Sequence, residues 1–180
     1  MEDLFHWSAE EVPWPLYRTI YPLHQDAQHD FSKPIGFWVS PDTEDGWESW
    51  CRGHDSHLER LAVKSRVVVS PTAKIMRIKN FDELNAFVDC YYGADISESF
   101  CRHGLPGAMK NTMIDWHRVY KDWDGILIIP YLFRFSLLGV TRYYWYYTWD
   151  CASGCIWNLD AIEAIERVKT EGSEQHEKLV

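Results

Sequence analysis

The sequence predicts a single α+β domain over residues 1–170, followed by a polar tail at 171–180 that we expect to be disordered. Three observations lead to this class. The length of 180 residues suits one hydrophobic core. Short runs rich in aromatic and β-branched residues alternate with segments of helical periodicity. Neither an internal repeat nor a low-complexity linker divides the sequence.

Strand-like runs occur along the whole chain. Residues 1–15 are expected to be irregular, because Pro13 and Pro15 disfavour a helix. We expect strands at 16–21, 35–39, 66–70, 74–78, 126–130 and 143–149. The run at 126–130 is apolar throughout, which is typical of a central strand. Ser153-Gly154 then predicts a turn, after which an apolar run resumes at 155–157.

Helical signals separate these runs. We expect helices at 45–53, 80–92 and 112–123, and a fourth after Asn158. The apolar residues of this fourth helix recur at helical spacing: Leu159, Ile162, Ile165 and Val168. The helix at 80–92 begins with a capping box formed by Asn80 and Glu83. Residues 93–111 contain four Gly or Pro residues and no periodicity, which predicts a long loop of the kind that often forms a functional lid.

Charge and composition disfavour several classes of protein. The formal net charge is −9 and no run of four basic residues occurs, so binding along extended duplex nucleic acid is disfavoured. No stretch of eighteen apolar residues and no signal-peptide pattern is present, so we expect a cytoplasmic protein without membrane contacts. The ten Trp, ten Tyr and eight Phe residues suit an aromatic core, and also a wide cleft with flat walls.

Most common catalytic motifs are missing from the sequence. It contains no Gly-x-Ser-x-Gly, no P-loop and no Gly-x-Gly-x-x-Gly. Five cysteines form no Cys-x-x-Cys pair, so we expect reduced thiols. The spacings among Cys101, His103, Cys151 and Cys155 do not match paired zinc ligands, and we expect no metal site. A catalytic Cys–His pair has no supporting spacing either.

Two segments near the start of the chain are candidates for chemistry. Arg18 shares one face of its expected strand with aliphatic residues. It therefore either pairs with a structural acid, such as Asp115 or Asp124, or points into a cleft. Trp38 comes after Gly36, which lets a ligand or another backbone approach closely. Taken alone, Trp38 is better suited to a core position.

The third candidate is the carboxylate of Asp150, which follows an aromatic run at 143–149. If that run is a strand, Asp150 lies at the rim of the sheet and faces a cleft. Alternatively, Asp150 caps the turn expected at Ser153-Gly154, a position that favours Asp.

These segments carry a resemblance to a known family. In "LYRT" at 16–19, "KPIGFWVS" at 33–40 and "YTWDCASGCIW" at 147–157, the sequence resembles the ADP-ribosyltransferase fold family. Its members carry an Arg or His on the first strand, an aromatic second strand beginning with Gly, and a late carboxylate. That acid is most often Glu, whereas this chain has Asp150. The Ser-Thr-Ser and Glu-x-Glu motifs of the arginine-modifying subclass are missing.

The resemblance implies a fold and a set of residue roles. It implies a split, mixed or antiparallel sheet with flanking helices, and NAD as the substrate. Asp150 and Arg18 would be the catalytic residues, because Asp150 would stabilise an oxocarbenium-like transition state and Arg18 would hold a ribose hydroxyl or the pyrophosphate. Trp38 would stack on nicotinamide. The remaining NAD contacts would come from Tyr17, Thr19, Gly36 and Ser40.

The resemblance also implies an activity. Such an enzyme transfers ADP-ribose to a macromolecular acceptor, for which the acidic composition favours a protein, or it hydrolyses NAD. Compact members of the family are often bacterial toxins, effectors or phage proteins acting in the cytoplasm of the producing or host cell. A different class of protein is also open: a non-catalytic module that uses the aromatic cleft to bind a nucleotide or a protein partner.

Overall fold

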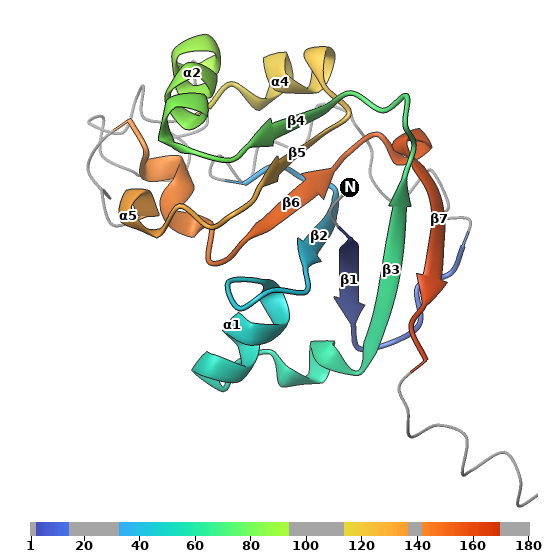
Figure 1. Cartoon of the computed structure of the whole chain (residues 1–180). Helices are drawn as coiled ribbons and strands as arrows, with labels where there is room; N and C mark the ends of the chain where they lie inside the picture. Colours follow the sequence, from blue (N-terminus) through green and yellow to red (C-terminus); the bar gives the residue numbers. More distant parts are fainter. Residues whose placement is uncertain (1–2, 15–32, 94–113, 137–141, 170–180) are drawn as a thin grey trace, which may run out of the picture.

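Seven strands form one mixed sheet, against which helices pack (Figure 1). The computed structural model describes residues 3–14, 33–93, 114–136 and 142–169. The strands are β1 (Leu4–Ser8), β2 (Phe37–Pro41), β3 (Val63–Val69), β4 (Ile75–Ile78), β5 (Gly125–Ile128), β6 (Ser153–Ile156) and β7 (Ile162–Arg167). Their order is β4-β5-β6-β2-β1-β3-β7, and the neighbours are antiparallel except β4 and β5. The expected α+β class with a mixed sheet is therefore confirmed.

The helices lie at two ends of the molecule. They are α1 (Trp47–His54), α2 (Phe81–Tyr91), α4 (Trp116–Asp122) and α5 (Phe133–Ser136), with 3₁₀ helices η2 (Leu58–Leu61), η4 (Tyr144–Thr148) and η5 (Leu159–Ala161). Figure 1 shows α2 and α4 beside β4, and α1 at the opposite end. As expected, the side chain of Asn80 caps α2 by accepting a hydrogen bond from the Glu83 N–H. No helix within the described ranges has the length and apolar character that a membrane span requires.

The sheet has a narrow join between β1 and β2. Their register covers two residue pairs, Leu4 with Pro41 and Phe5 with Ser40. By contrast, β1 pairs with β3 over five positions. The join therefore divides the sheet into a four-stranded part, β4-β5-β6-β2, and a three-stranded part, β1-β3-β7.

Each face of the sheet carries its own hydrophobic cluster. The larger cluster fills the space between the four-stranded part and α2, α4 and η4, and it includes Trp145, Trp149 and Trp157. The smaller cluster joins Leu127 and Ile156 of the four-stranded part to Val67 and Ile162 of the three-stranded part. Phe37 of β2 and Leu4 of β1 belong to the same cluster, so it runs from strand to strand along this face and connects the two parts of the sheet.

Hydrogen bonds to Asp124 connect three neighbouring strands of the four-stranded part. One carboxylate oxygen accepts a hydrogen bond from the Lys74 N–H at 2.8 Å, and the other accepts from the Asn158 side chain at 2.8 Å. Its backbone carbonyl accepts from the N–H groups of Trp157 and Asn158. Asp124 therefore connects the strands β4, β5 and β6, and its carboxylate oxygens both have structural partners.

Three of the expected elements are wrong. The run 143–149 forms the 3₁₀ helix η4 rather than a strand: the consecutive rings of Trp145 and Tyr146 are both buried and Tyr147 is exposed, so burial does not alternate. The helix expected after Asn158 is one turn of 3₁₀ helix followed by the edge strand β7, whose Ile residues pair with β3. The turn expected at Ser153-Gly154 is the start of β6.

Smaller differences concern the positions of elements. Residues 4–8, expected to be irregular, form β1 between two partner strands. The strand at 125–128 is fully buried as expected, yet it lies next to the edge strand β4 rather than at the centre. α1 runs past Gly53 and ends where Asp55 takes a left-handed conformation with φ of 48°. The strand expected at 16–21, the tail and almost all of the expected loop at 93–111 lie outside the described residues.

Glycine substitutions distinguish packed from free positions in this fold. At Gly154 an added Cβ would lie 2.2 Å from the Leu127 side chain and 2.4 Å from the Ile126 carbonyl oxygen, whereas at Gly53 it would meet nothing within 4 Å. We expect Gly154→Ala to lower the free energy of unfolding by at least about 1–3 kcal/mol. Gly53→Ala, in the exposed part of α1, should raise it by about 0.5–1 kcal/mol. Urea denaturation followed by circular dichroism measures both, and equal effects would contradict the strand packing described here.

Candidate functional site

A pocket of about 320 Å³ opens over the join between β1 and β2. Its volume lies near the lower end of the range for small-molecule sites, roughly 300–1,000 Å³. β1 contributes Phe5, His6 and Trp7 to the lining, and Trp38 comes from β2. The antiparallel pairing of Phe5 with Ser40 places Phe5, Trp7 and Trp38 on the same face of the sheet. The pocket therefore has a largely aromatic floor.

The structure brings four of the predicted site residues to this pocket. Gly36, Trp38, Ser40 and Asp150 all line it, although Asp150 is more than 100 residues from the others in the chain. The other three predicted site residues, Tyr17, Arg18 and Thr19, lie outside the described residues. Trp38 and Asp150, the two that we expect to contact nicotinamide and ribose, thus line the same pocket.

Asp150 lies in the short segment between η4 and β6. Its Oδ2 is 3.2 Å from the ammonium nitrogen of Lys33, and 40% of the side chain is exposed. The alternative that Asp150 caps a turn at Ser153-Gly154 is wrong, because those residues belong to a strand. The carboxylate is free to act on a ligand once Lys33 is displaced.

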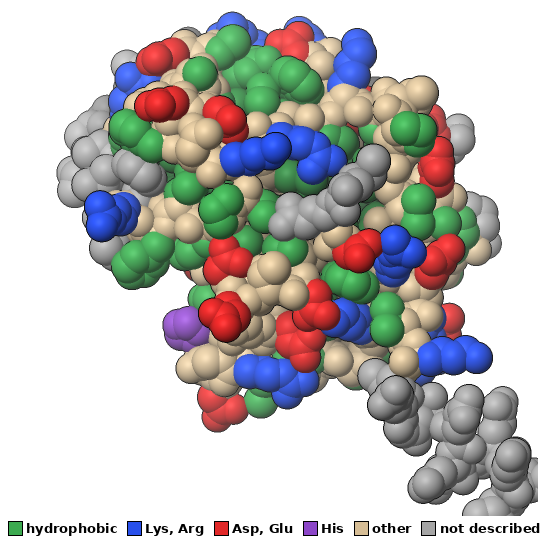
Figure 2. Space-filling model, viewed as in Figure 1, with side chains coloured by type: hydrophobic (Ala, Val, Ile, Leu, Met, Phe, Trp, Pro, Cys, Tyr) green, Lys and Arg blue, Asp and Glu red, His purple; other side chains and the backbone are tan. Residues whose placement is uncertain are grey.

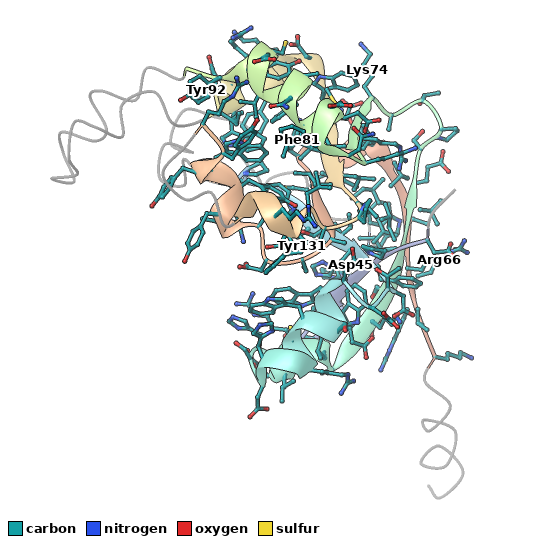
Figure 3. The ribbon with its side chains drawn as sticks, turned by 60° about the vertical axis from the view of Figure 1, so that its left-hand side comes forward. Asp45, Arg66, Lys74, Phe81, Tyr92 and Tyr131 are labelled. Atoms are coloured by element: carbon teal, nitrogen blue, oxygen red, sulfur yellow. The ribbon has the colours of Figure 1, made fainter. Side chains whose placement is uncertain are left out.

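The backbone next to Asp150 is fixed by the corner before α1. The Ala152 N–H donates to the Asp45 carbonyl oxygen at 2.7 Å, and the Asp45 carboxylate accepts from the Tyr131 N–H at 2.8 Å. Asp45 and Tyr131 lie close together in Figure 3. The position of Asp150 therefore depends on segments from three parts of the sequence.

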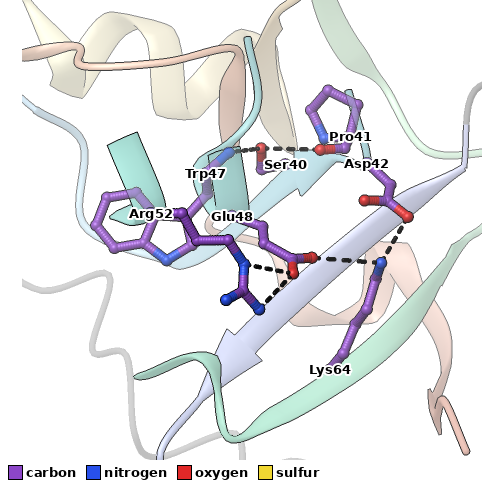
Figure 4. Close-up of polar contacts among 7 residues, drawn as sticks. All are labelled: Ser40, Pro41, Asp42, Trp47, Glu48, Arg52 and Lys64. Atoms are coloured by element: carbon purple, nitrogen blue, oxygen red, sulfur yellow. Dashed lines mark hydrogen bonds and ion pairs between the residues drawn. The ribbon is translucent and has the colours of Figure 1, made fainter. Parts of the chain in front are cut away.

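Ser40 has a structural role at the pocket wall. Its buried hydroxyl donates to the Ala152 carbonyl oxygen at 2.6 Å. It also accepts from the Trp47 N–H, the first of α1, at 2.8 Å (Figure 4). Both capacities of the hydroxyl are thus used within the protein. These bonds link β2, α1 and the Asp150 segment, and the expected contact of Ser40 with a cofactor stays a prediction.

Gly36 and Trp38 contribute to the pocket in different ways. A Cβ at Gly36 would lie 2.6 Å from the Ile156 carbonyl oxygen, so the glycine is needed for the close approach of the neighbouring strand. Trp38 is half-buried and contacts Trp149 with ring centres 5.0 Å apart. It therefore rests on the core through one side and lines the pocket through the other.

His6 is also among the residues that line the pocket, although no sequence motif indicates it. Its Nδ1 is 2.7 Å from the Trp38 carbonyl oxygen and therefore donates the hydrogen, which leaves Nε2 as an acceptor in the neutral ring. The imidazole stacks on Phe37 at 4.2 Å. Burial lowers the pKa of His6 below its ordinary value, although the hydrogen bond to Trp38 acts in the opposite direction. His6 is therefore neutral at pH 7.

Two cations at the pocket were also missed by sequence reasoning. Lys33 and Arg60 both line it, against the single carboxylate of Asp150. Their spacing in the sequence predicts nothing, because Arg60 belongs to η2, which the chain reaches through a corner after α1. The pocket thus has a formal charge of +1 in a protein whose net charge is −9. Elsewhere, on the face shown in Figure 2, acidic and basic side chains are interspersed.

The cysteines near the site are poor nucleophiles. Cys51, Cys151 and Cys155 are buried free thiols. Burial raises the pKa of Cys151 to about 12, so its thiolate is scarce at neutral pH. In the described parts of the chain, no three His, Cys, Asp or Glu side chains gather in a group that could hold a metal ion.

The chain matches no protein-family model, no curated protein and no solved structure. The pocket's own chemistry therefore has to carry any functional argument.

The Ser40 hydroxyl can be tested by its removal. Ser40→Ala leaves the Ala152 carbonyl and the Trp47 N–H without their buried partner, so we expect the free energy of unfolding to fall by about 1–3 kcal/mol. Ser49→Ala, at an exposed position in α1, is the matched control and should change it by less than about 0.5 kcal/mol. Urea denaturation compares the two, and similar values would contradict the assigned role.

The neutral His6 predicts a dependence of stability on pH. A histidine whose pKa is lowered by folding binds its proton more weakly in the folded state, so stability is fully present above the unfolded pKa and is lost as pH falls below it. We expect the free energy of unfolding to drop more between about pH 7.5 and pH 5 for the wild type than for His6→Phe. Denaturation at several pH values measures the difference, and parallel profiles would contradict it.

Proposed function

We propose that the protein is an NAD-dependent ADP-ribosyltransferase that modifies a macromolecular acceptor, with a protein as the favoured acceptor. One observation carries the proposal: the flat ring of Trp38 and the carboxylate of Asp150, distant in sequence, line the same pocket. The volume of about 320 Å³ suits the nicotinamide and its ribose rather than the whole dinucleotide. The three sequence motifs described above support the same assignment.

In this proposal Asp150 acts through its charge. The bond between nicotinamide and the ribose carbon breaks, and its electron pair leaves with nicotinamide, so positive charge develops on the ribose. A carboxylate aimed at that carbon stabilises this charge more in the transition state than in the ground state. The acceptor nucleophile then forms the new bond to the ribose carbon and loses its proton. With water as the acceptor, the same step hydrolyses NAD.

Other groups at the pocket would bind and orient the substrate. Trp38 offers a flat face for the nicotinamide ring, because its opposite side rests on Trp149. Arg18, with Tyr17 and Thr19, keeps the role that the resemblance implies, as a donor to ribose or pyrophosphate. A cytoplasmic site of action, as for toxins, effectors or phage proteins, belongs to this proposal too.

One observation favours a second function, a module that binds a nucleotide without turnover. Lys33 holds the Asp150 carboxylate at 3.2 Å, and a carboxylate that stays paired would bind ligands without stabilising a developing cation. The two functions differ in whether nicotinamide is released.

Nicotinamide release from NAD tests the proposal. We expect the wild type to release nicotinamide and Asp150→Asn, which keeps the shape and removes the charge, to lose at least about 100-fold in kcat. The matched control is Glu163→Gln, an exposed acid on β7 outside the pocket, which should retain wild-type rates. Chromatography of the products measures the release, with and without a cell lysate as the source of acceptors. The catalytic role of Asp150 would be rejected if Asp150→Asn released nicotinamide at the wild-type rate. It would also be rejected if the wild type bound NAD without releasing nicotinamide.

A further inference from the structure

The ammonium group of Lys33 lies between two walls of the pocket. It is 3.2 Å from Oδ2 of Asp150 and 5.5 Å from the centre of the Trp38 ring. A carboxylate and the face of an indole both attract positive charge, the first through its own charge and the second through the quadrupole of the ring. Together they form a subsite for a cation, which the protein fills with its own side chain.

We propose that the space between Trp38 and Asp150 is a receptor for a flat cationic ring of the pyridinium class, and that Lys33 is an internal competitor for it. The identification of the pyridinium rests on the proposed function, since the nicotinamide of NAD is such a ring. The cation subsite itself rests on the two Lys33 contacts. Binding of the ligand then requires Lys33 to leave.

Displacement of Lys33 by such a ring is favourable. The side chains of Lys33 and Asp150 are 31% and 40% exposed, so solvent screens their ion pair and it contributes little to stability. A released ammonium is well hydrated, whereas a delocalised ring cation is weakly hydrated and covers much of the indole face. The ring therefore gains contact area at Trp38 that the narrow lysine chain does not use.

Lys64 is a lysine with a structural role in the same protein, and it can be compared with Lys33. Its ammonium also lies over aromatic rings, those of Phe5 at 4.6 Å and Trp7 at 5.3 Å. However, it has two carboxylate partners, Asp42 at 2.6 Å and Glu48 at 3.7 Å (Figure 4), and only 18% of its side chain is exposed. Lys33 has Asp150 as its single carboxylate partner among the described residues, and it is more exposed than Lys64, so it is the lysine that a ligand displaces.

The remaining charged and titratable groups that line the pocket offer no second site for a cation besides the space between Trp38 and Asp150. Arg60 lines the pocket but lies 4.0 Å from Glu59 on exposed surface, and it supplies no negative charge. His6 is neutral at pH 7 because it is buried. Asp150 is thus the single carboxylate among the residues that line the pocket, and a cation has one place to bind.

Isothermal titration calorimetry at low salt tests the inference with 1-methylnicotinamide, a permanent pyridinium, and neutral nicotinamide as its comparator. We expect the wild type to bind the cation at least about fivefold more tightly than the neutral ring. Lys33→Met should tighten binding of 1-methylnicotinamide by about twofold to fivefold, because the competitor is removed. Binding of neutral nicotinamide should change less.

Two controls separate competition from a general effect of charge. Lys74→Met removes an exposed positive charge elsewhere and should leave the affinity for 1-methylnicotinamide unchanged. Lys33→Arg keeps a competing cation and should not tighten binding. If Lys33→Met does not give a folded circular dichroism spectrum, Lys33→Gln replaces it. Unchanged or weaker binding of 1-methylnicotinamide by the Lys33→Met or Lys33→Gln variant would overturn the inference.

The outcome is independent of catalysis, because 1-methylnicotinamide carries a methyl group in place of ribose and is not cleaved. Release of nicotinamide from NAD, together with no preference for the cation, would overturn the cation subsite and leave the transferase proposal standing. A preference for the cation without any release from NAD would support the subsite and reject the enzyme.

Discussion

A single buried hydroxyl, that of Ser40, joins the parts of the protein on which the pocket depends. It donates to the segment that carries Asp150 and accepts from the first N–H of α1. Without it, the Ala152 carbonyl and the Trp47 N–H at the start of α1 would each lose a hydrogen-bond partner inside the fold. Together with the pairing of β2 with β6 and the bond from Ala152 to Asp45, the hydroxyl holds a carboxylate late in the chain beside a tryptophan early in it.

The aromatic residues have two separate uses in this protein. Most of them, such as Trp145 and Trp157, form the larger cluster beneath α2 and α4, where their size fills the space left by short strands. A smaller number, including Trp38 and Trp7, line the pocket from the sheet. Trp38 belongs to both groups, because it contacts the core residue Trp149 and also faces Lys33. The core therefore sets the orientation of one wall of the site.

Local signals predicted the elements that local interactions stabilise. The cap at Asn80 and the buried run of β5 follow from neighbouring residues, and they occur as expected. β7 and η4 could not be predicted in this way. The residues of β7 have helical spacing, but pairing with β3 decides their conformation, and η4 buries consecutive rings that a strand would have divided between two faces.

In the candidate site, too, some residues could be predicted from local motifs and others depend on tertiary structure. Trp38 and Asp150 were selected from their motifs, and the fold places both at one pocket. His6 and Arg60 have no motif, and their positions follow from the pairing of β1 and from the corner after α1. Lys33 was part of a quoted motif, yet its contact with Asp150 spans 117 positions of the chain and depends on tertiary structure alone.

The narrow join between β1 and β2 has a consequence for cooperativity. Two residue pairs connect the halves of the sheet there, and the pocket has walls on both halves. Backbone amides along this join have few neighbouring inter-strand hydrogen bonds to protect them. The two halves of the sheet can therefore exchange their amide hydrogens with solvent as partly independent units. A ligand that contacts both Trp7 and Trp38 would add contacts across the join between β1 and β2. It would thereby couple the folding of the two halves of the sheet more strongly.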